Sequence, residues 1–292
     1  MAIIIDKNTR LLVQGITGKE GSFHTKLMLE YGTKVVAGVT PGKEGQQVHG
    51  VPVYNTVKKA LEKHPEINTS IIFVPARFTM DAVYEAIDAG IERIIVITEG
   101  VPLWDELMFV TYARRNGVII VGPNTPGVIS PGKAKVGIMP GHVFKEGSIG
   151  VVSRSGTLTY EISREIVRVG FGESTVIGIG GDPVTGLDFI DVYKMFLEDP
   201  ETSAIVIIGE IGGDAEERLA HYIRKHGLEK PVIAYVAGMT APPGKRMGHA
   251  GAIISMGMGD WASKKRAFED VGVRVARTPW EIGEVLRKYL AK

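Results

Sequence analysis

Residues Arg10–Gly21 read RLLVQGITGKEG and join an apolar run to a glycine-rich turn. The run Arg10–Gln14 is typical of a buried β-strand, and the turn Gly15–Gly21 precedes a stretch where a helix is expected. Glycines between a strand and a helix let backbone amides face a phosphate, and the helix N-terminus adds partial positive charge. The spacing is a variant of the dinucleotide-binding fingerprint and predicts a nucleotide-binding sheet. The alternative is a turn whose glycines serve tight packing only.

Similar apolar, β-branched runs alternate with helical patterns, such as Phe78–Ala89, along the whole chain. This alternation predicts parallel sheets covered by helices. In the first half we expect strands at Arg10–Gln14, Lys34–Val39, Ser70–Val74, Ile94–Ile97 and Val118–Val121. In the second half we expect them at Ile149–Ser153, Thr175–Ile179, Ala204–Ile208, Pro231–Val236 and Val271–Val275. Between the halves, Gly127–Gly147 is loop-rich and weakly periodic, so we place the domain boundary inside it.

The composition is that of a globular protein. The 292 residues are 44% hydrophobic and 23% charged, and the net charge of +1 predicts no bulk attraction to nucleic acid or to a membrane surface. No apolar run approaches the roughly 20 residues that span a bilayer, and the N-terminus does not read as a signal peptide, so we expect a cytoplasmic protein. Cysteine is absent, which excludes disulfides, thiolate metal sites and a cysteine nucleophile within this chain.

The end of the second expected strand bears on the ligand of the first half. An NAD site usually has an acidic residue there, which holds the ribose hydroxyls. This chain has Val39-Thr40-Pro41-Gly42-Lys43 instead. Lys43 suits a ligand with an extra phosphate near its ribose, such as coenzyme A or NADP; otherwise it is a solvated turn lysine. Thr98-Glu99-Gly100 closes the fourth strand at the same edge, and Glu99 suits an uncharged part of the ligand.

In the second half, Ser153-Arg154-Ser155-Gly156-Thr157 ends a strand and opens a strongly amphipathic helix. Free amides at such a helix start can hold a phosphate or a phosphorylated side chain, although a simple Ser/Thr cap explains the residues equally well. Glu210 follows another expected strand, Ala204–Ile208. Its carboxylate could accept a proton from an imidazole Nδ1, or it could cap the helix that starts near Asp214.

One histidine has the surroundings of a nucleophile. His249 lies in Gly244-Lys245-Arg246-Met247-Gly248-His249-Ala250-Gly251-Ala252, between small residues and after two cations. Glycines allow close approach to the ring, the cations attract an anion, and a neutral imidazole can attack phosphorus. The alternative is a surface loop with a solvated histidine. The other histidines show no metal-ligand spacing, and we expect no metal in this chain.

Taken together, these motifs resemble the α subunits of succinate–CoA ligases (succinyl-CoA synthetases) over the full length. The matching stretches are Gln14–Gly18, Tyr31–Lys34, Gly38–Lys43, Ser153–Tyr160 and Gly248–Ala252. The resemblance implies an α/β fold in which a Rossmann-like CoA-binding domain (residues 1–128) and a connecting segment (129–147) precede a flavodoxin-like, parallel-sheet ligase domain (148–292) that carries a phosphohistidine. The family often has Ser-Gln where this chain has Lys19-Glu20, which puts side-chain contacts at those two positions in doubt.

The resemblance also implies roles for particular residues. His249 would carry the phosphoryl group, Glu210 would be its carboxylate partner, and Tyr160 would contact the substrate. Ser155 and Gly156 would hold the phosphate. Coenzyme A would be bound by Thr17, Gly18, Lys19, Glu20, Lys43, Ile97, Thr98 and Glu99.

A phosphohistidine must be loaded by a nucleotide, yet the sequence has no Gly-x-x-x-x-Gly-Lys-Ser/Thr run. The resemblance implies that ATP or GTP and Mg²⁺ bind a partner, the β subunit with its ATP-grasp domain, in an αβ or α2β2 assembly. An ADP-forming acetate–CoA or malate–CoA ligase subunit is an alternative of the same class. An NADP-binding oxidoreductase and a non-catalytic, CoA-binding regulatory module are alternatives of other classes.

Overall fold

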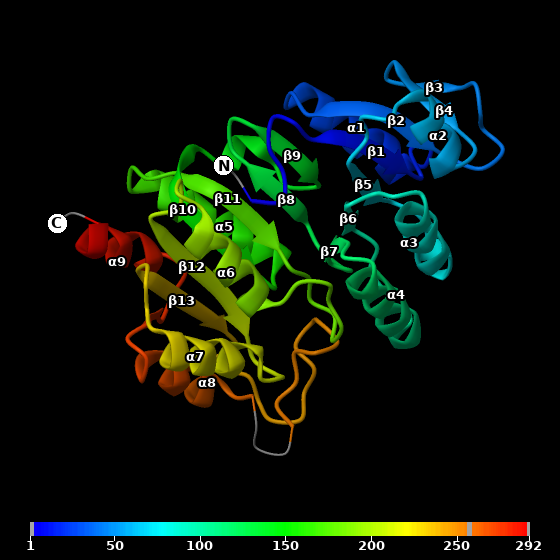
Figure 1. The fold of residues 1–292 in the computed structure, drawn as a ribbon. Coiled ribbons are helices and arrows are strands. Elements are labelled where there is room, and N and C mark those ends of the chain that lie inside the picture. Colours follow the sequence, from blue (N-terminus) through cyan, green and yellow to red (C-terminus); the bar gives the residue numbers. More distant parts are fainter. Residues whose placement is uncertain (1–2, 256–258, 291–292) are drawn as a thin grey trace.

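The computed structural model describes residues 3–255 and 259–290, and this part of the chain forms two sheets of seven strands each, one after the other in the sequence (Figure 1). No helix among the described residues is long and apolar enough to cross a membrane.

The first sheet has the order β3-β4-β2-β1-β5-β6-β7, and all of its neighbours are parallel except β3 and β4. Its strands are β1 (Arg10–Gln14), β2 (Lys34–Val39), β3 (Gln47–Val48), β4 (Val51–Tyr54), β5 (Thr69–Ile72), β6 (Arg93–Val96) and β7 (Ile119–Val121). Apart from β3, this is the Rossmann strand order, in which the direction of winding reverses between β1 and β5. Ligands of such sheets bind at this reversal, outside the carboxyl ends of the strands.

The second sheet has the order β14-β13-β12-β10-β11-β8-β9. Its parallel strands are β10 (Glu146–Ser153), β11 (Glu173–Gly178), β12 (Ala204–Glu210), β13 (Val232–Ala237) and β14 (Arg274–Ala276). This is the flavodoxin-like order, and its winding reverses between β10 and β12. The strands β8 (Gly127–Ser130) and β9 (Ala134–Gly137) extend the sheet at the edge beyond β11.

The hairpin of β8 and β9 differs from the expected loop-rich connection over residues 129–147. β8 runs antiparallel to β11, with Ile129 opposite Val176 and Val128 opposite Ile177. Ser130, Ala134 and Val136 are buried despite the glycines and lysines around them, so tertiary burial outweighs the weak local strand signal. Where one domain ends and the next begins stays a proposal, and the hairpin argues for a boundary before residue 127.

Helices cover both faces of each sheet. In the first half, α1 (Lys19–Glu30) lies on one face, and α2 (Val57–Lys63), α3 (Thr79–Asp88) and α4 (Leu103–Arg115) pack on the other. In the second half, α5 (Gly156–Arg168) and α9 (Glu281–Leu290) share one face. The opposite face is covered by α6 (Phe189–Glu198), α7 (Ala215–His226) and α8 (Trp261–Glu269).

The two halves share part of one hydrophobic core, which runs from Val13 and Met28 through Val128 and Val136 to Ile177. The loops after β7 and β11 also touch, since the Gly181 amide donates to the Asn124 carbonyl oxygen at 3.3 Å. A Cβ at Gly180 would overlap the Pro123 carbonyl oxygen, so the backbones approach as closely as glycine permits. The carboxyl edges of the two sheets therefore meet.

Candidate functional site

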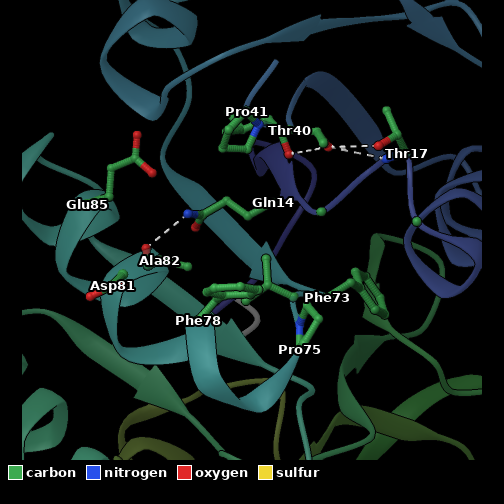
Figure 2. A pocket seen from close by; sticks show the side chains of 14 residues that line it. Gln14, Thr17, Thr40, Pro41, Phe73, Pro75, Phe78, Asp81, Ala82 and Glu85 are labelled. Atoms are coloured by element: carbon green, nitrogen blue, oxygen red, sulfur yellow. Dashed lines mark hydrogen bonds between the residues drawn. The ribbon is translucent and has the colours of Figure 1, made fainter. Parts of the chain in front are cut away.

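A cavity of about 600 Å³ lies where the winding of the first sheet reverses (Figure 2). Pro41, Phe73, Pro75 and Phe78 give it apolar walls, and the Gly15–Gly18 turn forms another side. Gln14 lines the cavity from below and is held in place, because its amide donates to the Ala82 carbonyl oxygen at 2.9 Å and accepts from Ser70 at 2.8 Å. The cavity is large enough for part of a nucleotide-sized ligand.

The turn beside this cavity has the features of an anion site. Gly18 precedes α1 and has no side chain to cap the helix, so the first-turn amides face outward without a side-chain acceptor. Gly15 has a φ of +82°, and a Cβ at Gly21 would overlap the Gly15 carbonyl oxygen. Close packing thus explains two of the glycines, while the uncapped helix start is what favours a phosphate.

The residues expected to bind a coenzyme fall into three groups. Thr17 and Gly18 line the cavity, and Thr17 Oγ1 lies 3.1 Å from Thr40 Oγ1. The side chains that begin α1 and the turn after β2 are exposed and outside the cavity lining; they are Lys19, Glu20 and Lys43. The loop after β6 adjoins the cavity without lining it: Thr98 donates to the carbonyl oxygen of Val74, which lines the cavity, and Glu99 lines a different cavity.

That second cavity, about 260 Å³, lies between the halves and contains His249. Glu99 and Asn124 line it from the loops after β6 and β7, and Asp182 and Arg246 line it from the second half. His249 is half-buried, and a Cβ at Gly181 would overlap its imidazole ring, so the turn after β11 lies flat against the ring.

His249 and Glu210 are in direct contact. The Nδ1 atom of His249 lies 2.8 Å from Oε2 and 3.0 Å from Oε1 of Glu210, and since a carboxylate only accepts, the imidazole donates from Nδ1. This hydrogen bond is the main cause of a raised pKa of His249, which burial and the charge of Arg154 partly oppose. When the ring is neutral, this tautomer carries its lone pair on Nε2, which makes Nε2 the nucleophilic atom.

A series of buried charges stands behind Glu210. Arg154, directly after β10, has Nη2 3.3 Å from Glu210 Oε1 and Nη1 3.8 Å from Glu216 Oε1. Glu216 Oε1 also accepts the backbone N–H of Glu210 at 3.1 Å. Lys264 then neutralises Glu216, with Nζ 2.5 Å from Oε2, and both side chains are 0% exposed. Glu216 holds Glu210 through its backbone N–H, and Lys264 compensates the charge of Glu216. In the sequence, both residues have the pattern of ordinary solvated charges on a helix.

The residues expected to hold phosphate or substrate adjoin this series. Ser155 caps α5, with its hydroxyl accepting the Leu158 amide at 3.3 Å, and Gly156 is the first residue of that helix. Tyr160 lies one turn further along α5, where its ring meets Phe144 edge-on and burial raises its pKa. None of the three lines the His249 cavity as described. Over residues 3–255 and 259–290, no group of three or more His, Asp or Glu side chains is arranged to hold a metal ion.

The fold and the two cavities define a chain of the CoA-ligase class, and comparison with known families agrees. Residues 6–100 match the model of the CoA binding domain, and residues 152–274 match that of the CoA-ligase family. The chain is 59% identical to the succinate–CoA ligase [ADP-forming] subunit alpha of Aquifex aeolicus, over 99% of this chain and 95% of that protein. It is 55% identical to subunit alpha 1 of Archaeoglobus fulgidus, over 99% of each chain. The chain belongs to the succinate–CoA ligase α-subunit family.

A solved structure shows the same fold at greater distance. The ATP citrate lyase of Methanothrix soehngenii, in complex with citrate and coenzyme A, superposes on 99% of this chain with a TM-score of 0.90. Sequence identity is 24%, and this chain spans about half (52%) of that longer chain. Both halves of the fold therefore recur together, in the same relative placement, inside a larger protein.

Proposed function

We propose that this chain is the α subunit of a succinate–CoA ligase, which forms succinyl-CoA reversibly from succinate and coenzyme A at the expense of a nucleoside triphosphate. The observation that carries the proposal is the contact of His249 Nδ1 with Glu210, which leaves Nε2 as a nucleophile in a cavity between the two halves. The relatives' printed names, which specify an ADP-forming ligase, support the substrate assignment.

In the proposed reaction, Nε2 of His249 attacks the terminal phosphorus of the nucleotide, and the bond from phosphorus to the diphosphate oxygen breaks. Glu210 stabilises the positive charge that develops on the ring by accepting the Nδ1 proton's hydrogen bond. A succinate carboxylate oxygen then takes the phosphoryl group from Nε2, giving succinyl phosphate. The coenzyme A thiol attacks the succinyl carbonyl, loses its proton, and displaces inorganic phosphate.

For coenzyme A, we assign the cavity of the first sheet and the uncapped start of α1, with Thr17 and Gly18 lining it and Lys43 reaching the 3′-phosphate from the adjoining turn. The backbone of Lys19 and Glu20 belongs to the same turn. Ser155 and Gly156 would bind the phosphoryl group, and Tyr160 the acid substrate. Glu99 faces His249, so we assign it, with Ile97 and Thr98, to the thiol-bearing end of the coenzyme rather than to its nucleotide.

The nucleotide requires a second subunit in this proposal. The relatives are named as α subunits, and the sequence lacks a phosphate-binding run of the Gly-x-x-x-x-Gly-Lys-Ser/Thr type. A β subunit with an ATP-grasp domain would bind ATP or GTP with Mg²⁺ and complete the His249 cavity, as an αβ or α2β2 assembly in the cytoplasm.

The test uses the co-expressed αβ enzyme and γ-labelled nucleotide. Wild type will acquire acid-labile, base-stable label on this chain, whereas His249→Asn will lose labelling and turnover by at least about a thousandfold. Coenzyme A binding will persist in that variant, because the coenzyme cavity lies in the other half. His221→Asn, at an exposed helix position, is the matched control and will label normally. Label that survives in His249→Asn, or that maps to Ser155, would contradict the proposal.

A further inference from the structure

Two carboxyl groups without an assigned role line the His249 cavity. Glu106 lies in the first turn of α4, and Asp182 follows β11, so the pair joins the two halves. Glu106 is 2% exposed and Asp182 is 9% exposed. Neither residue belongs to the series of buried charges behind Glu210.

If both carboxyl groups of this pair are ionised, each has an oxygen without a hydrogen-bond donor. Asp182 Oδ1 accepts from the Asn124 amide at 2.9 Å, but its Oδ2 is buried and has no donor within the described part of the chain. Glu106 Oε2 is likewise buried and without a donor. A buried carboxylate oxygen without a donor is costly, and two adjoining carboxylates repel each other. One shared proton removes both costs.

The surroundings favour Glu106 as the residue that keeps the proton. Burial, followed by the neighbouring Asp182 carboxyl group, raises the pKa of Glu106 to about 8, while the Val184 backbone works in the opposite direction. Asp182 Oδ1 already accepts from the Asn124 amide, whereas no side chain of the described residues donates to Glu106 Oε2.

We propose that Glu106 stays protonated at neutral pH and donates a hydrogen bond from its carboxyl group to Asp182, so that the pair acts as a positioning device for phosphorylated His249. The hydrogen bond ties α4 to the turn after β11, whose Gly181 lies against the imidazole ring. It also limits the pair to one negative charge beside a ring that must carry a phosphoryl dianion. This role rests on the proposed function.

The pH dependence follows from the charges that face this cavity. These are Glu99 from the loop after β6, Arg246 and His249 from the 244–252 loop, and Glu210 with Arg154 behind the ring. As pH rises through the raised pKa of His249, the ring loses its proton and phosphorylation increases, since only the neutral ring is nucleophilic. As pH rises further through about 8, Glu106 ionises, the hydrogen bond to Asp182 is lost, and a second negative charge enters the cavity. The initial rate of His249 phosphorylation will therefore fall as pH rises through that point.

The first arm of the test needs no activity. In the full chain labelled with ¹³C-glutamate, the carboxyl resonance that disappears in Glu106→Gln will titrate near pH 8 in wild type. In Asp182→Asn it will titrate at least one pH unit lower, because an amide can donate to the Glu106 carboxylate and carries no charge. A Glu106 resonance that titrates in the ordinary carboxyl range in wild type would overturn the proposal.

The second arm uses the αβ enzyme and the pH profile of His249 phosphorylation. In Glu106→Gln the amide supplies the same donor at every pH, so the alkaline fall will disappear or move up by at least one unit. Glu106→Leu, which has no donor, will instead lower phosphorylation at all pH values. Asp105→Asn, the neighbouring position on α4, removes one charge outside the cavity and will keep the alkaline fall.

An alkaline fall that survives in Glu106→Gln would overturn the positioning role. Absence of phosphorylation at every pH in wild type would instead contradict the proposed function, and the NMR titration would still decide the state of the pair.

Discussion

The two sheets carry different kinds of groups at the points where their winding reverses. Where the first sheet reverses, between β1 and β5, the cavity is formed by backbone turns and by Pro41, Phe73 and Phe78 (Figure 2). Where the second sheet reverses, between β10 and β12, the strand ends carry Arg154 and Glu210, which are both less than one-tenth exposed and paired with each other. One site is made mainly of main chain and apolar surface, and the other of buried charge.

This difference has an energetic reason. A ligand that brings its own phosphates needs only free amides and a cavity of the right shape, which glycines and prolines supply at little electrostatic cost. A histidine that must be nucleophilic and then hold a dianion needs a fixed carboxylate, and a buried carboxylate needs cations around it. We therefore expect the first site to be sensitive to added volume and the second to removed charge.

The largest effect is expected from Lys264, the cation furthest from the chemistry. Lys264→Met leaves Glu216 buried, with Arg154 Nη1 3.8 Å away as its remaining cation. Uncompensated burial of one member of such a pair costs about 3–5 kcal/mol. Denaturant unfolding of the full chain will measure this loss of unfolding free energy.

Lys265→Met is the matched control on the same helix. Lys265 pairs with Glu269 at 2.9 Å, but both side chains are partly exposed, and surface pairs of this kind contribute at most about 1 kcal/mol. Equal losses in the two variants would contradict the comparison, because they would mean that the buried Lys264 contributes no more to stability than a partly exposed lysine.

A smaller effect is expected from Gly21 in the first site. In Gly21→Ala the new Cβ overlaps the Gly15 carbonyl oxygen, so the turn must move by a backbone shift. Overpacking of this kind costs about 1–3 kcal/mol, although alanine is the better helix former by about 1 kcal/mol. Coenzyme A affinity, measured by calorimetry on the full chain, will fall by at least about tenfold. Lys26→Ala, on the exposed face of α1, will leave it unchanged. Unaltered affinity in Gly21→Ala would show that the turn does not touch the ligand.

How far the sequence alone could predict these features depends on whether their signal is local. The ranges predicted for β1 and β2 agree with the structure, and the strong apolar runs of β10 and β12 were also recognised, because each run is continuous and buried. The β8–β9 hairpin was missed, since its strands are short and their burial comes from β11 and the first half of the chain.

The same distinction applies to the sites. Glu210 could be proposed because it ends a recognisable strand, and His249 because it stands between glycines. Glu216 and Lys264 could not, because a helical Glu or Lys is usually solvated and only tertiary packing buries these two. The pairing of Glu106 with Asp182 was missed for a similar reason. The two residues come together only because α4 and the turn after β11 line the same cavity, and neither segment alone indicates this.

The smallest effect is expected from Lys43. This prediction sharpens the comparison because Lys43 is a charge on the turn beside the first cavity. Lys43 is exposed, and its own amide closes the turn by donating to the Thr40 carbonyl oxygen at 3.1 Å. Solvent screens an exposed cation, so its contact with the 3′-phosphate is worth about 1 kcal/mol, or roughly fivefold in affinity. Lys43→Ala will thus weaken coenzyme A binding about fivefold and leave the affinity for dephospho-coenzyme A unchanged, and the difference will shrink in high salt.

Lys58→Ala, at another exposed position in the same half, will change the affinity for neither ligand. Equal losses for both ligands in Lys43→Ala would place the lysine away from the 3′-phosphate. A loss well beyond tenfold would mean that charge matters as much in the first site as in the second.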